Sequence, residues 1–160
     1  MMNEEINRLL ELLDRTHSEI RSTIEGVDLE TPVHKDAGWK VRDIIGHIAV
    51  EDREAVKSIR AYNEGREYSI TDFDEQAFNT QAALEMGELS AQRVFEEWER
   101  AREDFKSAVQ EVPPDRYPGD LLYPWGDERG SIAQLVEDMC EHDEEHRSEI
   151  QAAIQGAQLV

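Results

Sequence analysis

Residues 141–150 read EHDEEHRSEI and place two histidines, His142 and His146, four positions apart. On an α-helix, residues four apart leave the same face. Leu135 and Met139 precede the histidines on the same stripe, which advances by four, three and four residues. This spacing is typical of the buried face of an amphipathic helix. We therefore predict that the segment is a helix of a bundle and that both imidazoles point into the bundle.

The inward pair of imidazoles indicates a shared metal ion, because neutral imidazole is a common ligand of several divalent metals. The pattern H-x-x-x-H is weak by itself, since two histidines at this spacing also occur by chance in acidic helices. Two ligands rarely hold a divalent ion, so we expect a third donor from another segment. The neighbouring Asp143, Glu144 and Glu145 are expected to project away from the stripe.

The composition restricts the class of protein. A length of 160 residues favours a single domain over residues 1–160. The chain has 37 acidic and 17 basic residues and a net charge of −20, which argues against nucleic acid or anionic membrane surfaces as partners. No apolar run approaches the ~20 residues that span a membrane, and no signal-peptide pattern opens the chain.

The single cysteine, Cys140, excludes an intrachain disulfide and fits the reducing cytoplasm, which is the expected location. We interpret Cys140 as a small buried hydrophobe. The alternative is a reactive thiol close to the metal.

Further helices are predicted from the same periodicity. We expect helices over residues 4–25, 40–63 and 90–112, with a shorter helical stretch before the last of these that begins near residue 72 or 74 and is interrupted at Gly87. A final helix is expected from Ser131 to about residue 154 or 155.

Serine residues mark the expected start of two helices. Ser90 is a plausible N-cap, and Ser131 with Gln134 forms a capping-box pattern. No segment alternates apolar and polar residues as a half-buried strand would. We therefore predict an all-α protein, a four-helix bundle, whose long connections leave room for a connectivity other than simple up-and-down.

Two residues of the helix over 40–63 are candidates for the site. His47 follows Ile44 by three residues on the shoulder of the apolar stripe, and it is the candidate third metal ligand. Glu51 lies one turn further on. It could orient a ligand imidazole or take a proton from a bound reactant, although most glutamates are simply solvated. His34 has no apolar periodicity around it and is expected to be exposed.

Three more residues are pocket candidates. His17 lies on the stripe of the first helix, where a hydrogen-bonded core histidine is the alternative. Asn79 could point inward or be a surface amide. Trp125 lies in the loop over residues 115–130, whose aromatic residues could cover a pocket or anchor the loop to the bundle or to a second subunit.

Several segments carry a resemblance to a known family. The segment GWKVRDIIGHI at residues 38–48, followed at a distance by the H-x-x-x-H pattern, resembles the DinB/YfiT-like superfamily. This superfamily includes mycothiol-dependent maleylpyruvate isomerase N-terminal domains and ClbS/DfsB-type proteins. The segments FDEQAFN at 73–79 and ELSAQRVFEEW at 88–98 look like its third helix. Lys40 departs from the pattern, because similar proteins tend to have Ser or Thr capping this helix.

The resemblance implies a four-helix bundle with up-down-down-up connectivity, often a homodimer, with a divalent metal held by three histidines. Carried over to this chain, the ligands are His47, His142 and His146. Three histidines leave a coordination position open, as catalytic sites do, and imidazole suits zinc, nickel and other divalent ions.

Three functions remain open at this point. The first is a metal-dependent transferase or isomerase that activates a low-molecular-weight thiol against a small electrophile. The second is a metal-dependent hydrolase, or a resistance protein that acts on a reactive small molecule. The third is a non-enzymatic module, either a stress-related dimer or a small-molecule binder.

Overall fold

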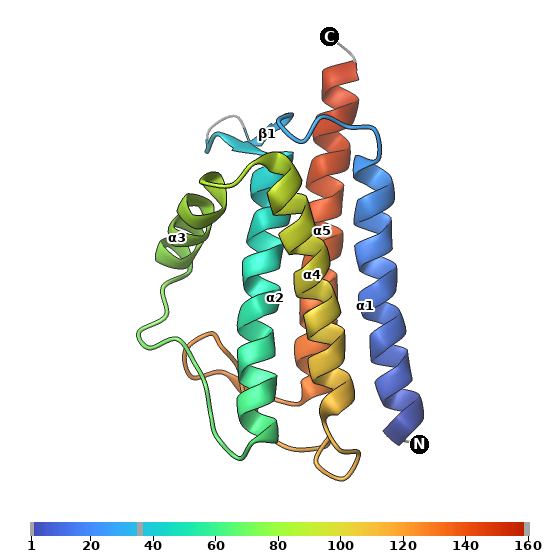
Figure 1. Ribbon diagram of the computed structural model, residues 1–160, viewed down its shortest axis with the longest axis vertical. Helices are drawn as coiled ribbons and strands as arrows, with labels where there is room; N and C mark the ends of the chain where they lie inside the picture. Colours follow the sequence, from blue (N-terminus) through green and yellow to red (C-terminus); the bar gives the residue numbers. More distant parts are fainter. Residues whose placement is uncertain (1, 35–36, 159–160) are drawn as a thin grey trace.

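The computed structural model describes residues 2–34 and 37–158, which form five helices and four short strands (Figure 1). In chain order the elements are α1 (Met2–Ile24), β1 (Pro32–His34), β2 (Trp39–Lys40), α2 (Val41–Asn63), α3 (Glu75–Gly87), α4 (Ala91–Glu111), β3 (Leu121–Leu122), β4 (Arg129–Gly130) and α5 (Ile132–Gln158).

The four long helices α1, α2, α4 and α5 form a bundle with the predicted up-down-down-up connectivity. In Figure 1, α1 runs up, α2 and α4 both run down, and α5 runs up again. Because α2 and α4 run in the same direction, the chain between them has to return along the bundle. The short helix α3 lies in this return and packs against α2.

The apolar core consists of two clusters, one toward each end of the bundle, and polar residues lie between them. On α1, for example, Leu13 belongs to one cluster and Ile20 to the other. On α4 the same division falls between Ala101 and Phe105. The residues between the clusters are buried but polar, and they include Thr16, His17, Asp52, Arg102 and Asp143.

Polar side chains fix the starts of the helices, as expected from the sequence. The Ser90 hydroxyl accepts a hydrogen bond from the Arg93 amide at 3.2 Å. The Ser131 hydroxyl accepts one from the Gln134 amide at 3.0 Å, but the Gln134 side chain donates to Asp138 instead of returning to the cap. The capping box predicted at this position is therefore only half formed.

Lys40, the N-cap residue of α2, has no hydroxyl group that could cap the helix. The Asp43 carboxylate accepts a hydrogen bond from the backbone amide of Lys40 at 2.8 Å. One orphan amide at the helix start is thereby satisfied from within the helix. The Lys40 ammonium instead forms an ion pair with Glu30 at 2.7 Å.

The prediction that the chain has no strands is wrong in detail. Two antiparallel hairpins occur among the described residues, β1 with β2 and β3 with β4. Their strands are two or three residues long, too short to show an alternating apolar pattern in the sequence.

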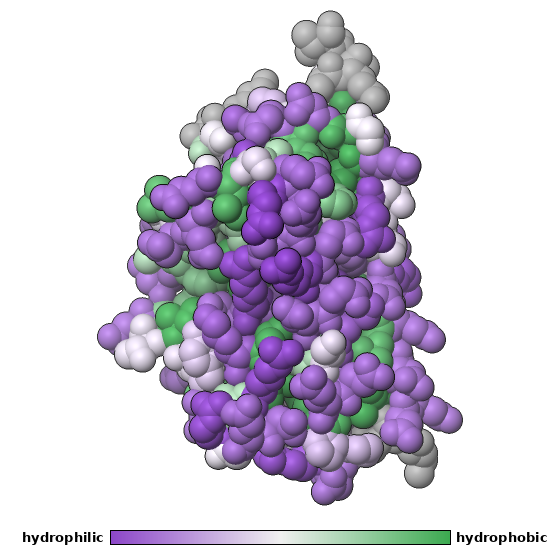
Figure 2. All heavy atoms as spheres, viewed as in Figure 1, coloured by the Kyte–Doolittle hydropathy of each residue, from purple (hydrophilic) through white to green (hydrophobic). Residues whose placement is uncertain are grey.

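The surface agrees with the acidic composition. The face shown in Figure 2 is mostly hydrophilic, and Leu84 is the one large hydrophobic side chain that stands exposed among the described residues. Within the part of the chain that the structure describes, no helix combines the length and apolar character needed to cross a membrane.

Candidate metal centre

Three histidines and one glutamate converge in the bundle from two helices. His47 and Glu51 lie one turn apart on α2, and His142 and His146 lie one turn apart on α5. One possible ligand atom from each of the four residues lies within 4.8 Å of the others. The tertiary structure therefore brings together the three imidazoles that the sequence analysis proposed as ligands, and it adds the Glu51 carboxylate to them.

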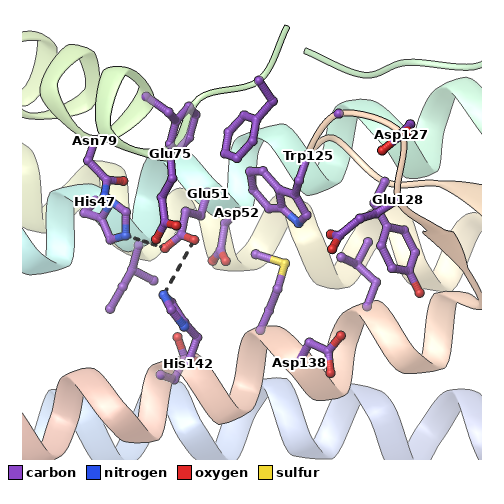
Figure 3. A pocket seen from close by; sticks show the side chains of 18 residues that line it. His47, Glu51, Asp52, Glu75, Asn79, Trp125, Asp127, Glu128, Asp138 and His142 are labelled. Carbon is purple, nitrogen blue, oxygen red and sulfur yellow. Dashed lines mark ion pairs between the residues drawn. The ribbon is translucent and has the colours of Figure 1, made fainter. Parts of the chain in front are cut away.

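Glu51 lies between two of the imidazoles (Figure 3). Its Oε1 lies 2.8 Å from Nε2 of His47, and its Oε2 lies 3.9 Å from Nε2 of His142. Burial on its own raises the pKa of the Glu51 carboxyl, but the hydrogen bond with His47 and the charges of the imidazoles outweigh burial and lower the pKa. The cluster therefore favours an ionised carboxylate beside the histidines.

His146 is the most informative member of the cluster. Its side chain is 11% exposed, and neither ring nitrogen has a hydrogen-bond partner among the described residues. Burial lowers the pKa of the His146 imidazole, and His142 and His47 lower it further. A buried imidazole that is neutral and unpartnered is costly unless a further group, such as a metal ion, accepts its nitrogen lone pair.

A second ring of carboxylates surrounds the histidines. Glu149 of α5 lies 3.4 Å from Nδ1 of His146 and 2.6 Å from Nε2 of His34 on β1. Glu145 lies 3.5 Å from Nδ1 of His142. Carboxylates beside a ligand imidazole orient the ring and increase its basicity. His34 was expected to be exposed; its side chain is 43% exposed, but it is paired with Glu149.

The residues fit a divalent metal ion. Three imidazoles, with a carboxylate beside them, suit zinc and nickel. A bound ion would take up a ring nitrogen of His146 that has no hydrogen-bond partner among the described residues. The side chain of His142 is 45% exposed, so one side of the cluster is accessible.

A buried ionic network lies directly behind the histidines. The guanidinium of Arg102 on α4 binds Asp52 of α2 at 2.9 Å and Asp143 of α5 at 2.9 Å, and donates to the Leu13 carbonyl of α1 at 3.0 Å. The Thr16 hydroxyl donates to Asp143 at 2.7 Å. One side chain thus connects all four long helices at the level of the site.

Asp143 corrects an expectation from the sequence. It was expected to project away from the stripe, but it is 2% exposed and paired with Arg102. Arg102 and Asp52 were not among the residues predicted from the sequence to be buried. A signal existed, because Arg102 lies four residues after Trp98 and Asp52 lies four after Ile48. Charged residues of opposite sign at apolar stripe positions predict a buried ion pair.

A cavity of about 540 Å³ opens beside the histidines. His47, Glu51 and His142 lie at one end of it, and loop residues lie at the other (Figure 3). This volume is within the range of small-molecule sites. Asn79 and Trp125, two of the predicted pocket residues, both line it.

Aromatic side chains from two connections form one wall of the cavity. Phe73 and Phe78 lie at the start of α3, and their ring centroids are 5.7 and 5.8 Å from that of Trp125. The two connections are joined by the backbone, since the Ile70 amide donates to the Pro124 carbonyl at 3.0 Å. The loop over residues 115–130 therefore covers the pocket, as one of the two interpretations expected.

The structure does not place His17 in this cavity, which corrects its choice as a pocket candidate. Its ring packs on Trp98 with a centroid distance of 3.8 Å, and its Nε2 lies 3.3 Å from Glu99. Cys140 is also outside the cavity lining. Burial raises the pKa of its thiol to about 12, in agreement with the interpretation as a small buried hydrophobe.

Comparison with known proteins places this geometry in a family context. A family model described as the mycothiol maleylpyruvate isomerase N-terminal domain matches residues 10–119. The matched segment contains His47 and Glu51 and ends before His142 and His146. A search of curated proteins by sequence gives no match.

Two solved structures share the fold. YfiT from Bacillus subtilis, described as a probable metal-dependent hydrolase with an unusual four-helix bundle topology, is 14% identical, with 97% of this chain and 89% of that chain covered and a TM-score of 0.74. Mycothiol-dependent maleylpyruvate isomerase is 13% identical, with 91% of this chain covered and a TM-score of 0.74. The present chain spans only 60% of that isomerase's chain. The family match over residues 10–119, together with these folds, shows that the chain belongs to the mycothiol maleylpyruvate isomerase N-terminal domain family, within the DinB/YfiT-like superfamily.

Proposed function

We propose that this protein is a metal-dependent enzyme that acts on a small molecule in the cavity beside the three histidines. The observation that carries the proposal is the convergence of His47, His142 and His146 within 4.8 Å, with Glu51 among them. His146 supports it further, because neither of its ring nitrogens has a hydrogen-bond partner among the described residues. A divalent ion bound there, zinc or nickel by the chemistry of its ligands, would lower the pKa of a coordinated thiol or water and polarise the reactant.

The remaining residues divide the other tasks. Glu51 is the proton acceptor, since its carboxylate lies on the cavity side of the cluster and touches two imidazoles. Trp125, Phe73 and Phe78 hold the apolar part of the substrate and exclude water from one side. Asn79 offers an amide at the edge of the cavity that can fix the orientation of a polar group.

We favour attack by a low-molecular-weight thiol on an electrophile, as a transferase or isomerase would perform it. The support is the family to which the chain belongs and a solved relative that is a mycothiol-dependent isomerase. The cavity volume of about 540 Å³ leaves room for a thiol and a second small reactant.

Hydrolysis is the second candidate function, because the fold is shared with a protein described as a probable metal-dependent hydrolase. The same Glu51 would then accept a proton from water. Incorporation of labelled oxygen from water into the product would select hydrolysis, whereas a thiol adduct or thiol-dependent turnover would select the first candidate.

The central experiment combines metal analysis with variants of the cluster. The protein is purified after growth with zinc and nickel supplied, and bound metal is measured for the wild type, His142→Ala and Glu51→Gln. We expect about one ion per chain in the wild type and a large loss in His142→Ala. Glu51→Gln should keep the metal and lose activity by about 10²–10⁴-fold if the carboxylate is the general base.

Two outcomes would contradict this assignment. A wild-type protein without metal would remove the basis of the proposal and favour the third hypothesis, a stress-related binding module without turnover. Loss of metal in Glu51→Gln would make Glu51 a ligand, not the proton acceptor. Glu11→Gln is a control, since Glu11 is exposed on α1 and belongs neither to the metal cluster nor to the cavity lining.

A further inference from the structure

Acidic side chains dominate the lining of the cavity. Seven of its residues are aspartate or glutamate, and among the described residues that line it none is lysine or arginine. Three of these carboxylates are compensated, since Glu51 lies among the histidines and Asp52 and Asp143 share Arg102. Of the other four, Glu75 is drawn with Glu51 at the histidine end in Figure 3, whereas Asp127, Glu128 and Asp138, here called the outer carboxylates, lie beyond Trp125.

Among the described residues, neither the three outer carboxylates nor Glu75 is neutralised by a neighbouring cation. In the part of the chain that the structure describes, none of the four takes part in an ion pair, although Asp138 accepts a hydrogen bond from the neutral amide of Gln134 at 2.7 Å. Figure 3 shows the Glu75 carboxylate at the histidine end with Glu51, and the Glu128 carboxylate on the other side of Trp125. Carboxylates that line one concave surface raise the local concentration of cations and repel anions.

The aromatic wall adds a second feature that suits a cation. Phe73, Phe78 and Trp125 are in mutual contact, with ring centroids 5.7–5.8 Å apart. Aromatic faces attract alkylated ammonium groups, tryptophan most strongly. Trp125 lies between the histidine end of the cavity and the outer carboxylates.

We propose that the substrate of this site is a small molecule with a protonated amine or another cationic group, which lies among the outer carboxylates while its reactive part reaches the histidine cluster. The inference rests on the proposed metal-dependent function and specifies its substrate class. It also means that a carboxylate at the outer end of the substrate is disfavoured, because none of the described lining residues is lysine or arginine.

The test uses three probes that differ only in charge at one end. They are benzohydroxamic acids with an aminomethyl, a methyl or a carboxylate group in the para position. The hydroxamate would bind the metal, and the para group would then face the outer carboxylates. Dissociation constants are measured by calorimetry on the zinc-loaded full-length chain at low ionic strength, where charge effects are least screened.

We expect the aminomethyl probe to bind most tightly and the carboxylate probe most weakly, with about a tenfold step between successive probes. In the double variant Glu128→Gln with Asp138→Asn, the ratio between the aminomethyl and carboxylate probes should fall about tenfold, while the neutral methyl probe binds as before.

A matched control separates the local effect from the net charge of −20. Glu11→Gln with Glu25→Gln removes the same two charges from exposed positions of α1 and the turn after it, and its probe ratios should equal those of the wild type. Equal affinity for all three probes, or an equal response of the control variant, would overturn the inference on the substrate. If no zinc binds, the proposed function falls and this inference falls with it; if zinc and the methyl probe bind without a charge order, only this inference fails.

Discussion

At the scale of single residues, Arg102 has the largest structural role outside the histidine cluster. It is 1% exposed, and its charge is compensated by Asp52 and Asp143, which are 0% and 2% exposed. Burial alone would lower the pKa of the guanidinium, but the two carboxylates reverse this and raise it. Such a network is costly to desolvate and costly to break, because removal of one member leaves buried charges without a partner.

We expect Arg102→Met to destabilise the protein by about 3–5 kcal/mol, the range for breaking a buried ion pair. Urea denaturation at neutral pH measures the change. Arg100→Met is the control, since its side chain is 65% exposed and makes only a 3.8 Å contact with Glu97, and it should cost less than about 1 kcal/mol. Equal effects of the two substitutions would show that the network contributes little.

His17 gives the protein a sensitivity to acid that does not depend on the metal site. Burial lowers its pKa from 6.5 to about 4, with a further lowering by Arg102 and an opposing effect of Glu99. The folded state therefore disfavours the protonated imidazole. The stabilisation of the folded state by the neutral His17 imidazole is complete above about pH 6.5. This stabilisation is lost as the pH falls from 6.5 toward 4.

We expect the wild type to lose up to about 3 kcal/mol more stability than His17→Gln over this interval, from ~1.36 kcal/mol per pKa unit. Urea denaturation at a series of pH values, with a chelator present to remove metal effects, measures the difference. Parallel pH profiles for the two proteins would show that His17 titrates normally in the folded state.

At the scale of elements, hydrogen bonds at the end of α3 and the start of α4 hold the crossover between α2 and α4 in place. α4 begins after Ser90, whose hydroxyl accepts from the Arg93 amide, and this start ends the crossover that carries α3. Arg42 of α2 also donates to the Met86 carbonyl at 3.1 Å and to the Leu89 carbonyl, which ties the end of α3 to the start of α2. The end of the crossover is therefore held by two sets of contacts: Arg42 binds the carbonyls at the end of α3, and Ser90 caps the start of α4.

We expect Ser90→Ala to cost about 1 kcal/mol, the usual value for a lost N-cap. Ser90→Asp should retain most of the stability, since its carboxylate can accept the same hydrogen bond and interacts well with the helix N-terminus. Thermal denaturation of the three proteins tests this. An alanine variant as stable as the wild type would mean that the cap is not needed at this junction.

At the scale of the whole molecule, the proposed metal would join α2 to α5. The histidines lie on these two helices, so a metal bound to all three stabilises only the folded arrangement. Binding to the folded state alone adds about 2.7 kcal/mol when free metal is at 100 times its dissociation constant. We expect a chelator to lower the midpoint of thermal unfolding and zinc to restore it.

The variant with His47, His142 and His146 all replaced by alanine is the control for this prediction. Its unfolding midpoint should not change with chelator or zinc. A shift of equal size in this variant would place the bound metal elsewhere on the acidic surface.

The homodimer and the cytoplasmic location that were expected from the sequence stay predictions. Light scattering of the purified chain at several concentrations tests the dimer: a mass of twice 18.4 kDa is the expected result, and the monomer mass at all concentrations would contradict it.

The sequence by itself determined where the helices lie and that His142 and His146 share a helix face, because both follow from the spacing of residues along the chain. The four-residue interval of His142 and His146 and the apolar stripes depend only on the 3.6-residue period of the helix. The end of α3 at Gly87 and the start of α4 after Ser90 follow from local backbone chemistry in the same way. Up-down-down-up connectivity came from the resemblance to a family, and the structure confirms it.

Only the tertiary structure decided which side chains meet across helices. The pairing of Arg102 with Asp52 and Asp143, the position of Glu51 between two imidazoles, and the displacement of His17 from the cavity all depend on the rotation and offset of one helix against another. Periodicity gives the buried face of each helix but not its partner, because ridge-and-groove packing is settled by side-chain contacts between distant segments. The charge of the cavity, and with it the proposed substrate, exists only once these segments are packed.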